Sequence, residues 1–200
     1  MKRKMFIVLV SIFISVFIQG CASGPQPIPA TYFDTPHHLS VQITQIKENP
    51  SFRDSGNGGL IGLVVGAGRS SDMKEMFEGI KGETVKELVR QEIERKLEGT
   101  FNIEEDSKDL GLEIEISHWG WFLPTTAFGI KTGSYQLEIM GTVSVYDVSH
   151  EKQKVAGLAI SSQKPLGNKP TAEMCQQALK QAIDDFAEQA KNTLLKEKKS

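Results

Sequence analysis

Leu110-Gly111-Leu112-Glu113-Ile114-Glu115-Ile116-Ser117 is the most regular stretch of the chain. Apolar side chains occupy every second position, and glycine, glutamate or serine occupies the positions between them. Side chains of a β-strand point alternately to the two faces of a sheet, so this pattern predicts a strand with one buried and one solvent-exposed face. Strands of this kind are typical of antiparallel sheets.

The same alternation recurs on both sides of this stretch. Residues 135–146 repeat it over a longer segment, and residues 39–46 and 154–161 show shorter versions of it. Together these segments predict one mainly antiparallel sheet of about four strands.

Two other segments have helical spacing. Apolar residues recur every three or four positions in residues 83–98, and Gly99 follows as a stop. A second amphipathic segment runs from Thr171, a suitable N-cap, to Leu195. The order of strand, helix, strands and helix predicts an α+β fold, a two-layer sandwich with two helices on one face of the sheet.

The first twenty residues have the composition of a secretion signal. Lys2, Arg3 and Lys4 give a positive start, and an apolar run follows from Met5 to Ile18. That run of about 14 residues is short for a helix that crosses a bilayer, which needs roughly 20. We therefore expect a signal peptide here instead of a permanent membrane helix.

The signal ends in Ile18-Gln19-Gly20-Cys21, which resembles the lipobox of bacterial lipoproteins, although Gln19 is unusual at its position. The resemblance implies that the Cys21 thiol receives a diacylglyceryl group before cleavage and that the new amino group is then often acylated. Several acyl chains anchor a protein firmly, whereas one chain binds a membrane only marginally. Ala22 stands where an aspartate would favour the inner membrane in this family, so the resemblance implies the outer membrane, facing the periplasm.

The remaining chain divides into a tether and one domain. Pro25, Pro27 and Pro29 favour an extended backbone, so residues 21–38 predict a lipidated tether. Residues 39–200 have a length that suits a single domain.

Charge and cysteine content exclude some classes of function. The full chain has 23 basic and 25 acidic residues, and the first twenty hold three of the basic ones, so the remaining chain has a net charge of −5. An acidic domain is not expected to bind nucleic acid. Cys175 has no partner for a disulfide once Cys21 is lipidated, and we interpret it as a small buried apolar residue.

A glycine-rich segment, residues 56–68, allows three interpretations. Gly58, Gly62 and Gly66 recur every four residues, which on a helix would form one smooth stripe. The segment could be a loop or short buried helix, an element for self-association or lipid contact, or a phosphate-binding loop. The last lacks the lysine and hydroxyl residue that normally end such a loop.

An aromatic segment follows the central strand, and we treat it as the main candidate for a binding surface. Trp119 and Trp121 continue the alternation on the polar face, and Phe122 and Phe128 lie close by. Exposed aromatic residues are typical of surfaces that bind proteins, glycans or lipids. The alternative is that a bulge resets the alternation and the indoles pack on their own domain, because one extra residue reverses the faces.

The sequence offers no convincing catalytic site, metal site or cofactor motif. The four histidines lack metal-ligand spacing, and no nucleophile motif occurs. Glu113 and Glu115 share one strand face, as in any solvated strand. We therefore interpret the protein as a non-enzyme.

These features predict a membrane-anchored envelope lipoprotein that acts as a binding or assembly module with an envelope protein as partner. Its architecture is weakly similar to small envelope lipoproteins, such as auxiliary lipoproteins of ABC-type transporters and activators of cell-wall synthases. Three alternatives stay open: a lipid or small-molecule carrier with an aromatic pocket, an envelope hydrolase, and a self-assembling structural lipoprotein.

Overall fold

The computed structural model describes residues 37–55, 75–77, 79–126 and 130–195. The described elements follow in the order β1 (His38–Ile46), β2 (Ser51–Asp54), α3 (Gly82–Leu97), β3 (Asn102–Ile103), β4 (Leu110–Leu123), β5 (Tyr135–Asp147), β6 (Gln153–Gly167) and α4 (Ala172–Leu195). None of the helices in the described part of the chain is long and apolar enough to cross a membrane.

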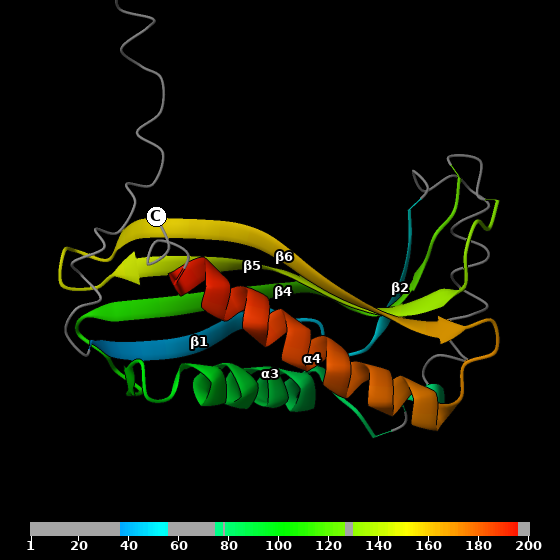
Figure 1. The fold of residues 1–200 in the computed structure, drawn as a ribbon, viewed down its shortest axis with the longest axis horizontal. Helices are drawn as coiled ribbons and strands as arrows, with labels where there is room; N and C mark the ends of the chain where they lie inside the picture. The colour runs from blue at the N-terminus through cyan, green and yellow to red at the C-terminus, as the bar shows by residue number, and fades with distance from the viewer. Residues whose placement is uncertain (1–36, 56–74, 78, 127–129, 196–200) are drawn as a thin grey trace, which may run out of the picture.

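One mixed sheet contains all the described strands, in the order β3-β1-β4-β5-β6, with β2 beside the far end of β4. The long strands β4, β5 and β6 are antiparallel neighbours, whereas β1 and β2 both run parallel to β4. β1 and β4 can run parallel as neighbours because the chain crosses back through α3 between them, and parallel neighbours need such a crossover. Figure 1 shows the resulting curled sheet above the two helices.

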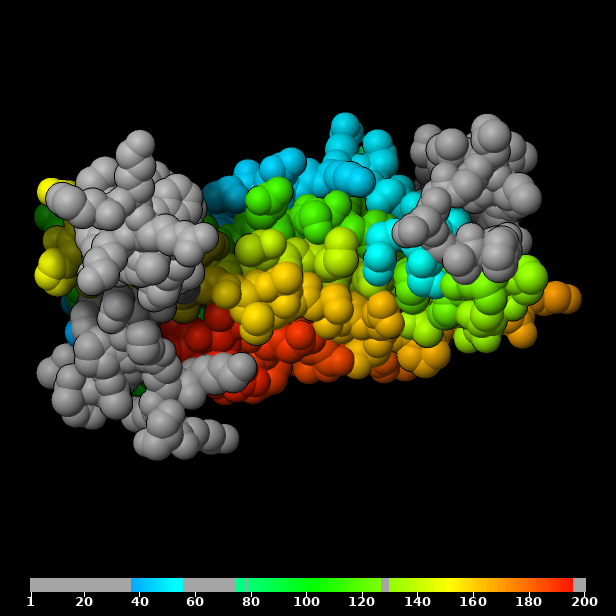
Figure 2. All heavy atoms as spheres, turned by 90° about the horizontal axis from the view of Figure 1, so that it is seen from above, coloured from blue at the N-terminus to red at the C-terminus, as the bar shows by residue number. Residues whose placement is uncertain are grey.

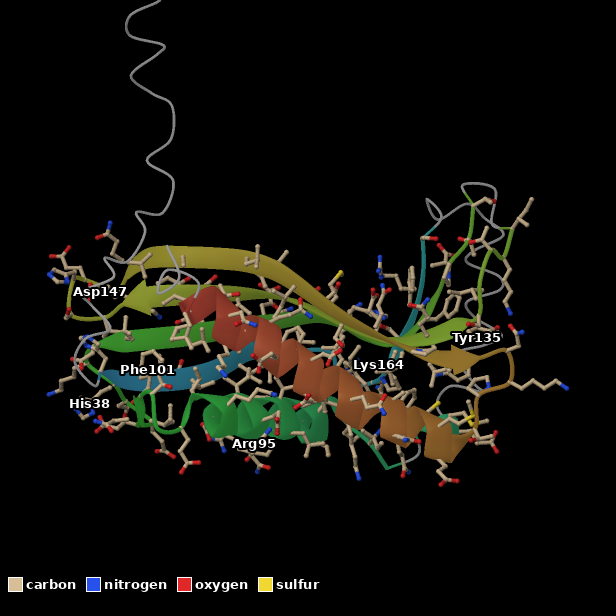
Figure 3. All side chains as sticks on the ribbon, viewed as in Figure 1. His38, Arg95, Phe101, Tyr135, Asp147 and Lys164 are labelled. Carbon is tan, nitrogen blue, oxygen red and sulfur yellow. The ribbon has the colours of Figure 1, made fainter. Side chains whose placement is uncertain are left out.

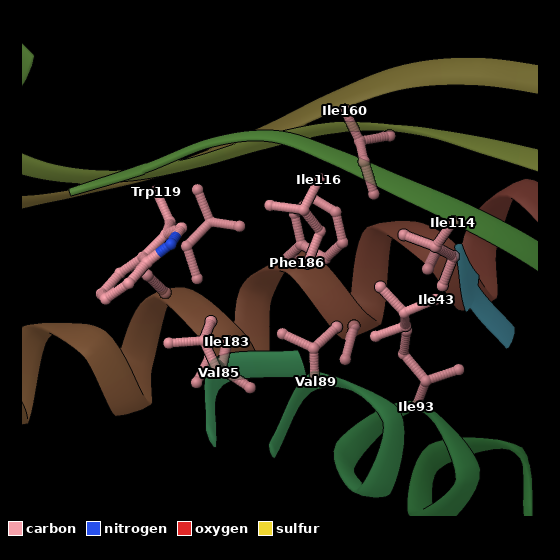
Figure 4. Packing of buried hydrophobic residues seen from close by; sticks show 14 of the residues in the cluster. Ile43, Val85, Val89, Ile93, Ile114, Ile116, Trp119, Ile160, Ile183 and Phe186 are labelled. Atoms are coloured by element: carbon pink, nitrogen blue, oxygen red, sulfur yellow. The ribbon is translucent and has the colours of Figure 1, made fainter. Parts of the chain in front are cut away.

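The predicted α+β architecture is confirmed, with two helices on one face of the sheet. The alternating residues of β4 send Leu110, Leu112, Ile114 and Ile116 into the core, and none of them is more than 1% exposed. Val85, Val89 and Ile93 of α3 and Phe186 of α4 meet them from the other layer, as Figure 4 shows.

The sheet is larger than the predicted four strands. β2 and the short β3 add to it, and β6 continues to Gly167, well past the predicted end. β2 has only four residues, all of them half-buried, so its sequence carries no alternation that could reveal it.

β4 changes its course between its two halves. Its pairing with β5 slips by one residue between Ile116 and His118, which marks a β-bulge. Two residues later, Gly120 has a φ of +135°, and a Cβ there would lie 2.3 Å from the carbonyl oxygen of Ser51. Only glycine permits this close approach of β2 to β4. In Figure 1, β2 rises from the sheet on the side away from the helices.

Candidate functional site

The expectation that Trp119 lies on the solvent-exposed face is wrong, and the alternative, that a bulge resets the alternation, is confirmed. The bulge in β4 adds one residue, so the alternation reverses and the side chain enters the core, where it is 0% exposed. Its indole Nε1 donates a hydrogen bond of 2.7 Å to the carbonyl oxygen of Lys47, and its ring meets Phe77 edge-to-face. Figure 4 shows the indole in the layer between β4 and the helices.

Trp121 lies on the same buried side of β4. Its ring packs against Tyr135 at a centroid distance of 5.2 Å, and it neighbours the fully buried thiol of Cys175 on α4. Burial raises the pKa of this thiol, and the nearby indole N–H opposes only part of the rise. A buried thiol with a raised pKa is inert, which agrees with the interpretation of Cys175 as a packing residue.

The other predicted site residues lie elsewhere. Phe122 points to the opposite face of the sheet, where the guanidinium of Arg53 covers its ring at 4.7 Å. The predicted lipidation site Cys21, the glycines Gly58, Gly62 and Gly66, and Phe128 lie outside the described residues.

A cluster of polar side chains occupies the face of the sheet away from the helices, beside the bend of β4. Arg53 of β2 makes two hydrogen bonds to the Glu138 carboxylate of β5, with lengths of 2.6 and 2.7 Å. Gln163 of β6 donates a third to the same carboxylate at 2.6 Å. With Ser51 and His118, described next, these residues form what we call the corner cluster.

Glu138 is 0% exposed, whereas the Arg53 side chain is 37% exposed. Burial acts to raise the pKa of Glu138, but the hydrogen bonds from Arg53 and Gln163 outweigh it and hold the pKa below its usual value. The carboxylate therefore stays ionised, and its charge is balanced by the guanidinium across the bend.

His118 of β4 completes the cluster next to Glu138. Its Nδ1 lies 2.9 Å from the hydroxyl of Ser51, and its Nε2 lies 3.7 Å from a carboxylate oxygen of Glu138. Burial lowers the pKa of His118 to about 4, and the charge of Glu138 only partly opposes this effect. At neutral pH the imidazole is uncharged and carries one proton. The Glu138 carboxylate favours that proton on Nε2, and in this tautomer Nδ1 accepts a hydrogen bond from the Ser51 hydroxyl.

The order serine, histidine, glutamate resembles a hydrolase relay, but two features weaken it as one. The carboxylate oxygens are already taken by Arg53 and Gln163, and an imidazole with a pKa of about 4 is a poor base for a serine hydroxyl. The side-chain contacts of the corner cluster instead link β2, β4, β5 and β6 across the bend of β4.

Sequence reasoning missed this cluster. Glu138 belongs to the polar positions of the alternating strand β5, where a glutamate is expected to face water. Its partner Arg53 lies 85 residues earlier in the chain. No local pattern in the sequence links the two residues.

The turn between β4 and β5 carries an exposed apolar side chain. Ile130 is 65% exposed, although its backbone is held by hydrogen bonds to Thr126, and Thr132 bonds to Pro124 on the other side of the turn. This hairpin end and the start of β1 lie at opposite ends of the molecule, as the labels of Tyr135 and His38 show in Figure 3.

A groove of about 820 Å³ lies at the end of α3, beside β3. Its lining mixes the apolar ring of Phe101 with Glu94, Arg95 and Glu98. Glu94 and Arg95 are already paired with other charged residues. Over residues 37–55, 75–77, 79–126 and 130–195, no three histidine, cysteine or acidic side chains come together as metal ligands.

Comparison with known proteins supports the fold. No family model matches the chain, and a search of curated proteins finds no match. Among solved structures, protein XCC0632 from Xanthomonas campestris, a DUF330 protein, is 13% identical, with 88% of this chain and 94% of that chain covered and a TM-score of 0.51. At this identity the likeness shows the fold alone.

Two further structures are more distant. A minor lipoprotein from Acinetobacter baumannii is 8% identical, covers 80% of this chain and 94% of its own, and has a TM-score of 0.42. The PelC dodecamer from Paraburkholderia phytofirmans is 9% identical, covers 82% and 95%, and has a TM-score of 0.32.

Proposed function

We propose that this chain is a lipid-anchored protein of the bacterial envelope that acts as a non-catalytic binding or assembly module. The anchor rests on the Ile18-Gln19-Gly20-Cys21 sequence after an apolar signal. Ala22 favours the outer membrane, with the folded domain in the periplasm.

The observation that carries the proposal is the separation between the anchored end and the hairpin. β1 begins at His38, directly after the tether, and Leu39 pairs with Leu110 at the start of β4. β4 has 14 residues and leads to the hairpin. At about 3.3 Å per residue, the path along β4 measures roughly 45 Å, and the bend shortens the direct distance, so the hairpin can still reach a partner away from the membrane surface.

The hairpin is also held rigidly for such a role. The side chains of Trp119 and Trp121 are buried in the core and hold the end of β4 in place. The corner cluster holds β2 and β5 together at the bend of β4. A binding element on rigid strands loses little conformational entropy on association. Ile130 presents an apolar side chain at the end of this support.

The same residues argue against the two main alternatives. The indoles of Trp119 and Trp121 fill the space that an aromatic ligand pocket would need, which weakens the carrier hypothesis. The weak base His118 and the occupied carboxylate of Glu138 weaken the hydrolase hypothesis.

Photo-crosslinking in cells tests the proposal. A photoreactive amino acid replaces Ile130 in the full-length lipoprotein, and a matched variant carries it at Leu88, an exposed apolar residue of α3 that is 40% exposed. We expect a discrete protein adduct at position 130 and none at position 88.

Equal labelling at both positions would indicate nonspecific contact and would contradict the proposal. The absence of any adduct at position 130, in a variant that folds and reaches the membrane normally, would contradict it as well. A lipid adduct at position 130 would favour the carrier hypothesis instead.

A further inference from the structure

β6 forms the outer edge of the sheet. It pairs with β5 on one side, and no described strand pairs with it on the other. Figure 2 shows this strand, in gold, along the margin of the sheet face, with α4 in red beyond it. A strand in this position presents a row of backbone N–H and C=O groups that a further strand can bind.

The residues that face outwards can be identified from the ladder. The register between β5 and β6 is unbroken from Pro165 to Ala156. The carbonyl oxygen of Ser161 accepts a hydrogen bond of 2.8 Å from the Gln189 side chain of α4, so Ser161 faces away from β5. Along a strand, the backbone N–H and C=O groups of successive residues point alternately toward the neighbouring strand and away from it. The backbone groups of Gly157 and Ala159 therefore also point away from β5. Pro165 belongs to the same set, and its missing N–H costs nothing on an edge.

α4 protects only part of this edge. Gln189 covers Ser161, and Asp185 of α4 pairs with Lys164. In residues 155–160, which we call the open edge, no described side chain bonds to the backbone. The open edge reads Val-Ala-Gly-Leu-Ala-Ile, without a charge or a proline. Edge strands normally carry such charges, prolines or bulges because these prevent further pairing. The open edge has a bulge only at its first residue, Val155, and is regular from Ala156 onwards.

The side chains of the open edge suit an added strand on both faces. Leu158 is 45% exposed and lies on the same face as Ile160, which enters the core. It offers an apolar contact for one side chain of the added strand. Gly157 and Ala159 lie on the opposite face, where the Lys154 side chain folds over Gly157 and brings its ammonium group to this face of the open edge.

Charge distinguishes between two candidates for the added strand, which are β6 of a second copy of this chain and a segment of a different protein. β6 contains two lysines and no acidic residue. Lys164 is neutralised by Asp185, whereas no described carboxylate pairs with Lys154, at the start of the open edge. A second copy of this chain that paired through its own β6 would bring more lysine and no carboxylate. A different, acidic segment matches this edge better.

We propose that the open edge of β6 binds an extended segment of another protein as an additional strand. The segment is uncharged at its centre, places an apolar side chain on Leu158 and carries a carboxylate that faces Lys154. Its backbone bonds to the outward N–H and C=O groups of Gly157 and Ala159, a common mode of peptide recognition. The proposal does not depend on the function of the hairpin.

The test uses the full-length protein in detergent micelles and a synthetic peptide, acetyl-Asp-Val-Thr-Val-Thr-Val-amide. Binding is measured by fluorescence anisotropy, and hydrogen exchange is followed by mass spectrometry. We expect the bound peptide to slow exchange in residues 155–161 by about tenfold or more, because a hydrogen-bonded amide exchanges only when it opens. The matched peptide with Lys in place of Asp should bind several-fold more weakly.

Two variants separate edge pairing from nonspecific binding. Ala159→Pro removes one outward N–H that the ladder with β5 does not use, so it should abolish binding while the circular dichroism spectrum is retained. Lys154→Glu should reverse the preference between the two peptides, and this holds even if the proline variant fails to fold.

Three results would overturn the proposal. These are unchanged exchange in residues 155–161 at saturating peptide, equal binding of both peptides to the native protein, and protection of this segment that grows with protein concentration without peptide. The last would assign the edge to a second copy of the chain.

Discussion

At the scale of single residues, the least expected feature is a fully buried carboxylate on the face of the sheet that lacks helices. Glu138 keeps its charge because Arg53 and Gln163 together give it three hydrogen bonds. A buried ion pair contributes little net stability compared with an apolar pair, but it becomes costly when one partner is lost. The pair therefore fixes where β2 lies relative to β5.

Replacement of Arg53 by methionine should be strongly destabilising. It leaves Glu138 buried without its counter-ion, which costs about 3 kcal/mol or more in the free energy of unfolding. The double variant Arg53→Met/Glu138→Leu should recover most of this loss, because it removes both charges. Urea denaturation measures both effects, and a single variant as stable as the native protein would show that the pair does not fix the bend.

The buried His118 predicts a pH dependence. Its pKa in the folded protein is about 4, below the ordinary value of 6.5 expected in the unfolded chain. The unfolded chain therefore binds more protons between these values, and stability falls as the pH falls from about 6.5 to about 4. The full loss from this group is on the order of 3 kcal/mol.

A non-titrating variant isolates this contribution. His118→Asn keeps an acceptor near the position of Nδ1, so the hydroxyl of Ser51 retains a partner. Urea midpoints measured across the same pH range should give a shallower dependence for this variant. An identical slope in both proteins would mean that another group causes it.

One extra residue in β4 explains why the tryptophans were misplaced. Strict alternation from Leu110 to Ile116 is visible in the sequence, but a bulge depends on how β5 pairs, which the local sequence does not encode. The alternation therefore predicted the first half of β4 correctly and placed Trp119 on the wrong face in the second half.

At the scale of elements, the periodic segments and the short strand at Phe101 and Ile103 were predictable, and β2 was not. The predicted helices 83–98 and 171–195 correspond to α3 and α4 within one residue at each end. Strong alternation located β1, β4, β5 and the first part of β6. β2 was missed because its pairing with β4 depends on the close approach at Gly120, a tertiary contact.

α4 should be the helix whose packing matters most to the sheet. Phe186 is fully buried beneath β5, and its ring lies 3.2 Å from the position that a Cβ of Gly141 would occupy. Phe186→Ala should cost about 3 to 5 kcal/mol because it leaves a cavity. Met174→Ala on the same helix is the control, since Met174 is 40% exposed. Thermal or urea unfolding compares the two, and equal losses would contradict the packing described above.

At the scale of the whole molecule, the fold places three features at separate positions. β1 begins at His38 at one end of the molecule, β5 begins at Tyr135 at the other end, and β6 runs between them. Such a layout suits a protein held at one end and bound by partners elsewhere. The sequence predicted the layers of the fold, whereas the position of the hairpin follows from the length and bend of β4. The anchor stays a prediction.

The central claim is that the chain is held in the envelope by lipid on Cys21, and intact-mass spectrometry of the protein purified from membranes tests it directly. The account predicts a mature chain that begins at Cys21 and carries a diacylglyceryl group, with or without an additional N-terminal acyl chain. The variant Cys21→Ala should lack this mass and remain unprocessed at this site. A native protein that retains residues 1–20, or one cleaved elsewhere and free of lipid, would contradict the claim.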